Sequence, residues 1–481
     1  MSSFAVRVLA VLIVAVLAVL GATLILDSGS SGPPRLVPGS GKAPGSDDKT
    51  VDPLAFTPAR ETALAAAAAR GNAHVIYAKS PGGARQSAAR VARYRPLIET
   101  VAAADKLDPD TLEAIVMLES AGRPDAYADP RFDGAVGLAQ ILAETGRSLL
   151  GMHVDPAGAR RVTRSIARAT RRGKSALVQR LRARRRGIDE RFDPAKSIQA
   201  MGRYLVFARG KVKRDDLAVV SYHMGVGNLQ TVLGLYGKRD ISYTRLYFNS
   251  TPLQNPKTYA KLASLGDDSA TYYWRVLAAK EIMRLYRADP AQLDRVSALQ
   301  TAKNSAEEVL HPGDKTERFA TPAELRKAYA DGRIRALPRA LLARNGIRID
   351  PGMGQLASRL SRSRSTYRGL RPAALALLVY LGAGVKAISG QQPLLVTSTV
   401  RDQRYQRLLV ASNLEATRNY SLHTTGWAFD ILRSYKSRAQ GLAFEFMLGR
   451  LQSLDLIAWV REPAAIHVTV SSDAKSLLSV L

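Results

Sequence analysis

Two histidines and one aspartate near the C-terminus could form a metal centre. His423 and Asp430 lie seven residues apart in Tyr-Ser-Leu-His-Thr-Thr-Gly-Trp-Ala-Phe-Asp (420–430), and His467 follows on a later segment. Imidazole nitrogens and carboxylate oxygens bind Zn²⁺, and a catalytic zinc keeps three protein ligands and an open position for water. Because the chain has only six histidines, the set predicts a zinc hydrolase. The alternative is that His423, which lies near Gly426, is only a hydrogen-bonded turn residue.

A second candidate for chemistry is Glu119, near the end of a predicted helix. Asp108 followed by Pro109 predicts the helix start, as N-cap and first helical residue. Three apolar residues precede Glu119 at helical spacing, which places it on the face that should be buried. Burial raises the pKa of a carboxyl, and a raised pKa suits a general acid. The alternative is a helix-end glutamate that pairs with a nearby arginine.

Several motifs follow in a fixed order. They are Glu119-Ser120, Gly134-Ala-Val-Gly-Leu-Ala-Gln-Ile141, Phe192-Asp-Pro-Ala-Lys-Ser-Ile198, Ala218-Val-Val-Ser-Tyr-His-Met-Gly-Val-Gly-Asn228 and Tyr272-Tyr-Trp-Arg-Val-Leu277. In order and spacing the pattern resembles the soluble lytic transglycosylases, which are lysozyme-like enzymes that cut the glycan strands of peptidoglycan. The resemblance covers about 88–290 and implies an all-α, lysozyme-like domain.

This resemblance implies a mechanism with one carboxyl group, whereas ordinary glycosidases use two. Glu119 would first protonate the leaving glycosidic oxygen and then act as base. The C6 hydroxyl of the sugar would attack and give a 1,6-anhydromuramoyl end. Ser120, Gln140 and Tyr222 would bind substrate in the cleft. His223 would also line it, at a position where the family usually has Asn, so sugar binding is expected to differ there.

The C-terminal motif also resembles a known family. Residues 421–430 fit Ser-x-His-x-x-Gly-x-Ala-x-Asp at every specified position, as in the zinc D,D- and L,D-carboxypeptidases and endopeptidases of the M15 class, which cut peptidoglycan stem peptides. The resemblance spans about 366–470. It implies an α+β domain with a small antiparallel sheet, Zn²⁺ held by His423, Asp430 and His467, and a substrate carboxylate held by Arg401.

The general base of this second site is an open point. The family places Glu three residues before its last His, whereas Glu462 lies five residues before His467. On a regular strand these offsets share a face but differ by about 6.6 Å along it. Only a bulge or turn would bring Glu462 into contact. A zinc site without turnover, acting as a wall-binding module, is therefore the alternative.

The net charge and the absence of cysteine restrict the kinds of partner and metal site that are expected. The net charge is +29 and there is no cysteine, which excludes disulfides and thiolate metal sites. Twelve Lys or Arg and no acid fall between 159 and 186, within a predicted basic helical insertion (155–190). This run is either a solvated face or a grip for anionic wall polymers or lipids. Nucleic acid is not expected as a partner, because the chain reads as exported and carries no nucleic-acid-binding motif.

An N-terminal apolar run predicts export. The nineteen residues 8–26 are uncharged and nearly match the roughly 30 Å hydrocarbon core of a bilayer. An uncleaved anchor is favoured over a signal peptide, because no cleavage site is evident. The sequence thus predicts a multidomain, membrane-tethered peptidoglycan hydrolase outside the cytoplasmic membrane, or alternatively a wall-binding scaffold with silent sites. The expected parts are a membrane segment (5–26), a tether and lead-in (27–87), the helical domain (88–290), a connecting region (291–365) and the zinc domain (366–481).

Overall fold

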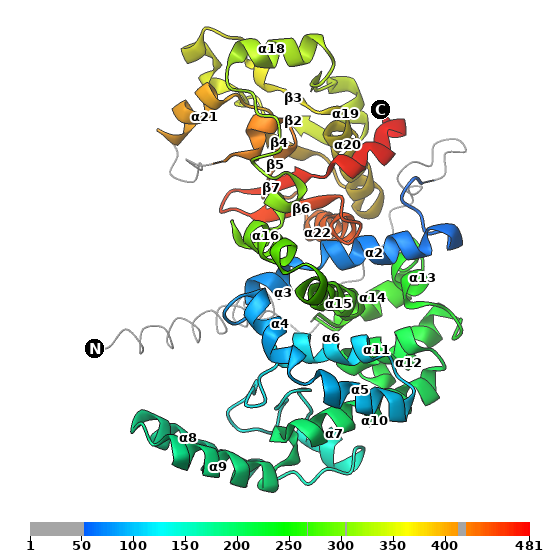
Figure 1. The fold of residues 1–481 in the computed structure, drawn as a ribbon. Helices are drawn as coiled ribbons and strands as arrows, with labels where there is room; N and C mark the ends of the chain where they lie inside the picture. The colour runs from blue at the N-terminus through cyan, green and yellow to red at the C-terminus, as the bar shows by residue number, and fades with distance from the viewer. Residues whose placement is uncertain (1–51, 267, 304, 412–419) are drawn as a thin grey trace. The chain divides into compact units, whose positions relative to one another are not determined.

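The computed structural model describes residues 52–266, 268–303, 305–411 and 420–481. The predicted membrane segment at 5–26 and the start of the tether lie outside the described residues. The described chain is mostly helical, with one small and one five-stranded sheet near the C-terminus (Figure 1). A mostly helical chain with a small sheet region agrees in part with the predicted fold class.

The first part of the chain, up to Thr301, consists of helices joined by loops, of which the one between α6 and α7 (residues 121–142) is long. They are η1 (Pro58–Arg60), α2 (Glu61–Gly71), α3 (His74–Lys79), α4 (Ala84–Ala92), α5 (Arg95–Asp105), α6 (Pro109–Ser120), α7 (Ala143–Ser148), α8 (Pro156–Arg171), α9 (Ser175–Ile188), η2 (Glu190–Phe192), α10 (Pro194–Val212), α11 (Asp215–Met224), α12 (Val226–Tyr236), α13 (Tyr243–Phe248), α14 (Pro256–Ser264), η3 (Asp268–Thr271), α15 (Tyr272–Ala288) and α16 (Pro290–Thr301).

Helix α6, which carries Glu119, begins as predicted. The carboxylate of Asp108 accepts a hydrogen bond from the backbone N–H of Asp110, and Pro109 occupies the first turn. The helix ends at Ser120, and the C-cap residue Ala121 adopts a left-handed conformation with φ 51°. Its apolar face is fully buried and packs against α4, α5 and α15. Glu119 is therefore held in the last turn of a central helix.

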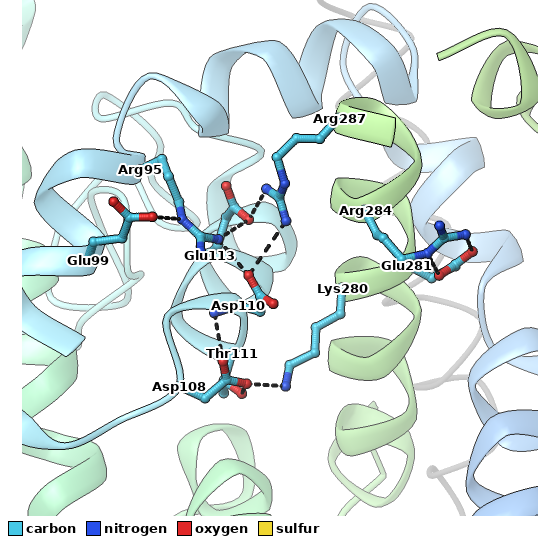
Figure 2. Close-up of polar contacts among 10 residues, drawn as sticks. All are labelled: Arg95, Glu99, Asp108, Asp110, Thr111, Glu113, Lys280, Glu281, Arg284 and Arg287. Carbon is cyan, nitrogen blue, oxygen red and sulfur yellow. Dashed lines mark hydrogen bonds and ion pairs between the residues drawn. The ribbon is translucent and has the colours of Figure 1, made fainter. Parts of the chain in front are cut away.

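Ion pairs lock α6 between α5 and α15 (Figure 2). Glu113 of α6 is fully buried, and its Oε2 lies 3.0 Å from Arg95 Nη1 of α5 and 2.6 Å from Arg287 Nη1 of α15. Arg95 also contacts Asp110 at 2.6 Å. A buried carboxylate is tolerated only when cations compensate its lost hydration. The cluster therefore fixes the helix that carries Glu119 against the helix that faces it.

We expect Arg95→Ala to lower the free energy of unfolding by about 2–3 kcal/mol, because it leaves Glu113 with one arginine instead of two. Arg284→Ala is the matched control, since its pair with Glu281 is more than half exposed on both sides and should contribute less than about 1 kcal/mol. Chemical denaturation of both variants measures the difference. Equal losses would contradict a special role for the buried cluster.

The predicted basic insertion folds as a helical hairpin made of α8 and α9 (Figure 1). Asp155 caps α8 by accepting a hydrogen bond from the N–H of Gly158, and Gly173 with φ 67° lies in the turn between the helices. The hairpin has a small apolar core of its own that includes Val162, Ile166 and Val178. Most of its arginines are exposed. The helical nature of the insertion is confirmed, while an anionic partner stays a prediction.

The C-terminal part is built around a five-stranded sheet. Its elements are α17 (Glu307–Leu310), α18 (Pro322–Ala330), β1 (Arg335–Ala336), α19 (Arg339–Arg344), β2 (Ile347–Ile349), η4 (Gln355–Leu360), η5 (Arg364–Tyr367), β3 (Gly369–Leu370), α20 (Pro372–Ser389), β4 (Leu394–Ser398), α21 (Gln403–Val410), η6 (Leu422–Thr425), β5 (Ala428–Leu432), α22 (Arg438–Gln452), β6 (Ile457–Arg461), β7 (Ala465–Val470) and η7 (Ser472–Val480).

The strand order is β2-β4-β5-β7-β6, and the prediction of an antiparallel sheet is only partly right. The pairs β4–β5, β5–β7 and β6–β7 are antiparallel, but β2 runs parallel to β4. Strand β2 comes from the region that was predicted only to connect the domains. The connection from β2 to β4 includes the long helix α20, as a parallel pair requires a crossover. The connecting region therefore contributes an edge strand to the sheet.

Helix α20 is the core helix of this part. Among the described residues it is the one helix long and apolar enough to cross a membrane by length and composition, and 72% of it is buried within the protein. It packs against α22 and η7. Its apolar surface is thus accounted for by packing inside the fold.

Candidate active site and candidate metal centre

Glu119 lines a pocket in the helical part. The pocket has a volume of about 260 Å³, and its lining includes Ser120, Arg123, His223 and Tyr272. Glu119 is half-buried, and its Oε1 accepts a hydrogen bond of 2.7 Å from the hydroxyl of Tyr272, the first residue of α15. Burial raises the pKa of Glu119 from 4.5 to about 7, although the Tyr272 hydrogen bond opposes the rise. A carboxyl with this pKa can donate and accept a proton near neutral pH.

The alternative of an arginine partner applies to another residue of the same helix. Glu113 is the glutamate of α6 that pairs with arginines, whereas the structure gives Glu119 a tyrosine hydroxyl as partner. A neutral donor stabilises the carboxylate less than a guanidinium does. The pKa of Glu119 can therefore stay high.

Aromatic rings lie beside Glu119, and those of His223 and Tyr272 line its pocket. The rings of Tyr222 and Tyr272 are stacked with centroids 6.5 Å apart, and His223 stacks on Tyr272 at 5.1 Å. His223 Nδ1 lies 2.9 Å from Ser269 Oγ. Burial raises the pKa of Tyr222 well above its usual range, and the charge of Glu119 adds to the rise. The structure thus places His223 on the pocket wall, whereas Tyr222 packs against Tyr272 and is not among the lining residues.

The polar groups of Ser120 and Gln140 are used within the fold. Ser120 Oγ donates to the carbonyl of Val116 at 3.2 Å, and Gln140 Nε2 donates to the carbonyl of Gly137 at 2.9 Å. Tyr222 similarly donates to the carbonyl of Ala139 at 2.7 Å. Ser120 lines the pocket, whereas Gln140 is not among its lining residues, and the bonds of Gln140 and Tyr222 hold the loop before α7 in place. Contact of these residues with a substrate stays a prediction.

A buried arginine, Arg191, fixes the loop that carries Gln140 through hydrogen bonds to its backbone carbonyls. Arg191 pairs with Asp189 at 2.8 Å and donates to the carbonyls of Phe132, Gly134 and Ile141. Gly137 has φ 81°, and a Cβ there would lie 1.8 Å from the carbonyl oxygen of Arg191. Only glycine fits this close approach. The packing of the loop therefore requires glycine at position 137.

Tyr272 is a site residue that the sequence analysis missed. The aromatic run is included in the sequence analysis only as the last of the ordered motifs, 272–277. Its hydroxyl contact with Glu119 joins residues 153 positions apart, and no local pattern encodes such a contact. The only available signal was the position of the run within the motif order.

The predicted metal ligands come together on the five-stranded sheet. Asp430 of β5 and His467 of β7 are directly opposite each other in the antiparallel ladder, and His423 lies in η6 just before β5. All three are buried, and their ligand atoms lie within 4.8 Å of one another. The turn-residue alternative for His423 is thus replaced by a buried cluster that could hold a metal ion.

The free ring nitrogens converge on the carboxylate of Asp430. His423 Nδ1 lies 2.8 Å from the carbonyl of Thr399, which leaves Nε2 at 3.2 Å from Asp430 Oδ2. His467 Nε2 lies 2.9 Å from Glu307 Oε1, which leaves Nδ1 at 2.7 Å from Asp430 Oδ1. Metal-binding histidines usually have their second nitrogen fixed by a carbonyl or carboxylate in this way. Two imidazoles and one carboxylate fit a zinc ion with an open position.

The charges of the cluster depend on one another. Burial and the charge of Arg401 lower the pKa of His423 to about 4. Burial disfavours protonated His467 as well, but hydrogen bonds to Asp430 and Glu307 outweigh it and raise the pKa of His467 to about 10. The two histidines hold the pKa of Asp430 well below its usual range against the effect of burial. A cation is therefore favoured between these ligands, either a proton on His467 or a metal ion in its place.

Arg401 lies beside this cluster, as predicted. Its Nη2 donates to Ser398 Oγ at 2.6 Å and lies 3.5 Å from Asp430 Oδ2, while Nη1 donates to Gln406 at 3.0 Å. Burial lowers the pKa of Arg401, and the charges of Asp430 and Glu462 oppose this. The guanidinium is thus oriented at the edge of the cluster. Its role toward a substrate carboxylate stays a prediction.

Glu462 lies at the hairpin between β6 and β7. A turn does intervene between Glu462 and His467, because the N–H of Glu462 donates to the carbonyl of Ala465 at 3.0 Å. Val460 is the cross-strand partner of His467, so Glu462, two residues further, falls on the same face of the ladder. This leaves Glu462 about 6.6 Å along the strand from the register of His467. Its function as a general base stays a prediction.

Glu307 is the second residue that the sequence analysis missed. It begins α17 in the connecting region, is buried, and contacts His467 Nε2 at 2.9 Å. Burial tends to raise its pKa, but the contact with His467 lowers it to about 2. Because 160 positions separate Glu307 from His467, no spacing rule pointed to it.

Known proteins add no assignment to this geometry. A scan of the chain against protein-family models finds no match, and a search of curated proteins finds no similar sequence. The function is therefore argued from the sequence motifs and from the two sites themselves.

Proposed function

We propose that this protein is a peptidoglycan hydrolase that cuts glycan strands at the Glu119 pocket. The observation that carries the proposal is a half-buried carboxyl with a pKa of about 7 on the wall of a pocket with aromatic rings. Three of the motifs that resemble those of soluble lytic transglycosylases contribute lining residues to this pocket, namely Glu119 and Ser120, His223, and Tyr272 with Arg275. Aromatic faces offer apolar surfaces on which a sugar ring can pack. The observations together favour an enzyme that acts on a polysaccharide.

The proposed reaction needs only one carboxyl group. Protonated Glu119 donates its proton to the leaving glycosidic oxygen as the C1–O bond breaks. The C6 hydroxyl of the same sugar then attacks C1 and gives its proton to the Glu119 carboxylate. The product carries a 1,6-anhydromuramoyl end, and Glu119 is restored to the protonated form. No second carboxylate and no water molecule enters the reaction.

We further propose that the C-terminal cluster is a zinc site that cuts stem peptides or cross-links. Zinc held by His423, Asp430 and His467 would acidify a bound water and polarise the scissile carbonyl. Arg401 would bind a carboxylate of the substrate through its fork of N–H donors. Glu462 would take the proton of the attacking water. The buried, converging ligand atoms support the metal site.

A second candidate function is wall binding without peptide cleavage. The observation that favours it is the position of Glu462, which the register leaves two residues along the ladder from His467. A zinc site with a substrate-binding arginine and no placed base would bind stem peptides without cutting them.

The proposed location of the protein is outside the cytoplasmic membrane, to which residues 8–26 would anchor it, and the proposed partner is peptidoglycan.

Digestion of purified peptidoglycan tests the proposal. The full chain is incubated with intact sacculi in the presence of Zn²⁺, and the released muropeptides are identified by mass spectrometry. Anhydromuramoyl ends support the first activity, and shortened or uncross-linked stem peptides support the second. An absence of anhydro ends would contradict the first activity. Uncut stem peptides with zinc bound would assign the C-terminal part as a binding module.

Tyr272→Phe is expected to shift the pH dependence of glycan cleavage. Because the hydroxyl of Tyr272 stabilises the Glu119 carboxylate, its loss should raise the pKa of Glu119 by up to about 1 unit. The rate should then fall at a higher pH than in the wild type. Tyr273→Phe makes the same chemical change one residue further on α15 and should leave the profile unchanged. Superimposable pH profiles for wild type and Tyr272→Phe would contradict this link.

A further inference from the structure

Glu307 lies in a polar arrangement of its own behind the metal cluster. Its Oε1 accepts from Thr469 Oγ1 at 2.7 Å and contacts His467 Nε2 at 2.9 Å, while Oε2 accepts from Ser305 Oγ at 2.9 Å. All four residues are buried. Both carboxylate oxygens are therefore engaged, and the direction in which Glu307 faces His467 is fixed.

The contact between Glu307 and His467 determines which ring nitrogen of His467 faces the other metal ligands. A carboxylate only accepts hydrogen bonds, so Nε2 must carry the proton that it shares with Glu307. In a neutral ring, Nδ1 then carries the lone pair, and it points toward Asp430 at 2.7 Å. Nδ1 and Nε2 lie on opposite edges of the imidazole. Glu307 is thus behind the ring and is not itself placed as a ligand.

We propose that Glu307 is the positioning residue of the metal centre, which sets the tautomer and orientation of His467 for metal binding. The inference rests on the proposed zinc site and extends it to the segment before the C-terminal domain. Such outer carboxylates also make the imidazole a stronger ligand. Segment 305–310 therefore completes the metal centre as well as joining the two parts of the chain.

The test measures Zn²⁺ affinity of the full chain by competition with a chromophoric chelator. Glu307→Ala should weaken binding by about 10- to 100-fold, the usual effect of removing an outer partner of a ligand. Glu307→Gln retains an oxygen that can accept from Nε2 and should restore part of the affinity. Glu308→Gln is the matched control, because Glu308 pairs with Lys303 at 3.2 Å and should leave affinity unchanged.

Two further measurements separate positioning from a purely structural role. The absorption spectrum of the Co²⁺-loaded chain reports ligand geometry and should change in Glu307→Gln, which is isosteric and expected to fold. The unfolding midpoint of the metal-free variants reports stability alone. A lower midpoint with unchanged affinity and spectrum would overturn the inference. A wild-type chain that binds no zinc would contradict the metal centre itself, whereas equal binding by wild type and Glu307→Ala overturns only the role of Glu307.

Discussion

Glu119→Gln is expected to lower the rate of glycan cleavage by about 10³-fold or more. General acid and general base catalysis each contribute about 10²- to 10⁴-fold, and the proposed reaction assigns both to this one carboxyl. Glutamine has nearly the same shape, and its carbonyl can still accept the hydrogen bond of Tyr272. The loss would therefore report chemistry and not a change of fold. The yield of anhydromuramoyl ends over time measures it.

The same substitution should stabilise the protein at alkaline pH. The pKa of Glu119 is raised from 4.5 to about 7 in the folded chain, so between these pH values the folded chain retains a proton that the unfolded chain loses. Stability then falls as pH rises through this window, by up to about 3 kcal/mol above pH 7. Glutamine does not ionise and escapes this loss. Glu119→Gln should match the wild type near pH 4 and exceed it at pH 8.

Glu281→Gln provides the control for both effects. Glu281 lies on α15 with about half of its side chain exposed, so it should change neither activity nor the pH dependence of unfolding. Thermal unfolding of the three proteins at pH 4 and pH 8 gives the comparison. An inactive Glu119→Gln with no gain of stability at pH 8 would show that Glu119 ionises normally. Full activity of Glu119→Gln would remove this residue from the proposed mechanism.

The sequence predicts elements whose signals are local. The start of α6 follows from Asp108 and Pro109, since capping involves only neighbouring residues. The strand that carries His467, Ala465–Val470, shows the period-two alternation and β-branched residues typical of a strand. Pairing of this strand with β5 places Asp430 directly opposite His467. The motif at 421–430 therefore contains two of the three residues of the observed cluster, His423 and Asp430.

The features that the sequence did not predict depend on contacts between distant segments. Tyr272 and Glu307 act through partners 153 and 160 positions away, and their own neighbourhoods carry no pattern that marks them. Strand β2 has only three residues, too few for alternation to be recognised. Its parallel pairing to β4 is decided by the crossover through α20. These contacts complete both sites, so motif spacing alone describes each site only in part.

Removal of zinc is expected to stop peptide cleavage and leave glycan cleavage intact. The peptide site depends on a metal that acidifies water, whereas none of His423, Asp430 and His467 lines the Glu119 pocket, where the proposed reaction uses a carboxyl group alone. Chelation, or His423→Ala, should therefore lower stem-peptide cleavage by more than about 10³-fold. His423 is chosen because its loss leaves two ligands, one fewer than a catalytic zinc usually has.

Both activities can be followed in one digest, so each serves as the control for the other. Continued formation of anhydro ends by His423→Ala would show that the chain is folded and that only the metal site is lost. Adding Zn²⁺ back to the chelated wild type should restore peptide cleavage, and adding it to His423→Ala should not. Peptide cleavage that survives chelation and the variant would contradict a metal-dependent peptidase. Loss of both activities in His423→Ala would mean that the imidazole supports the fold, because its Nδ1 contact with Thr399 joins η6 to the end of β4.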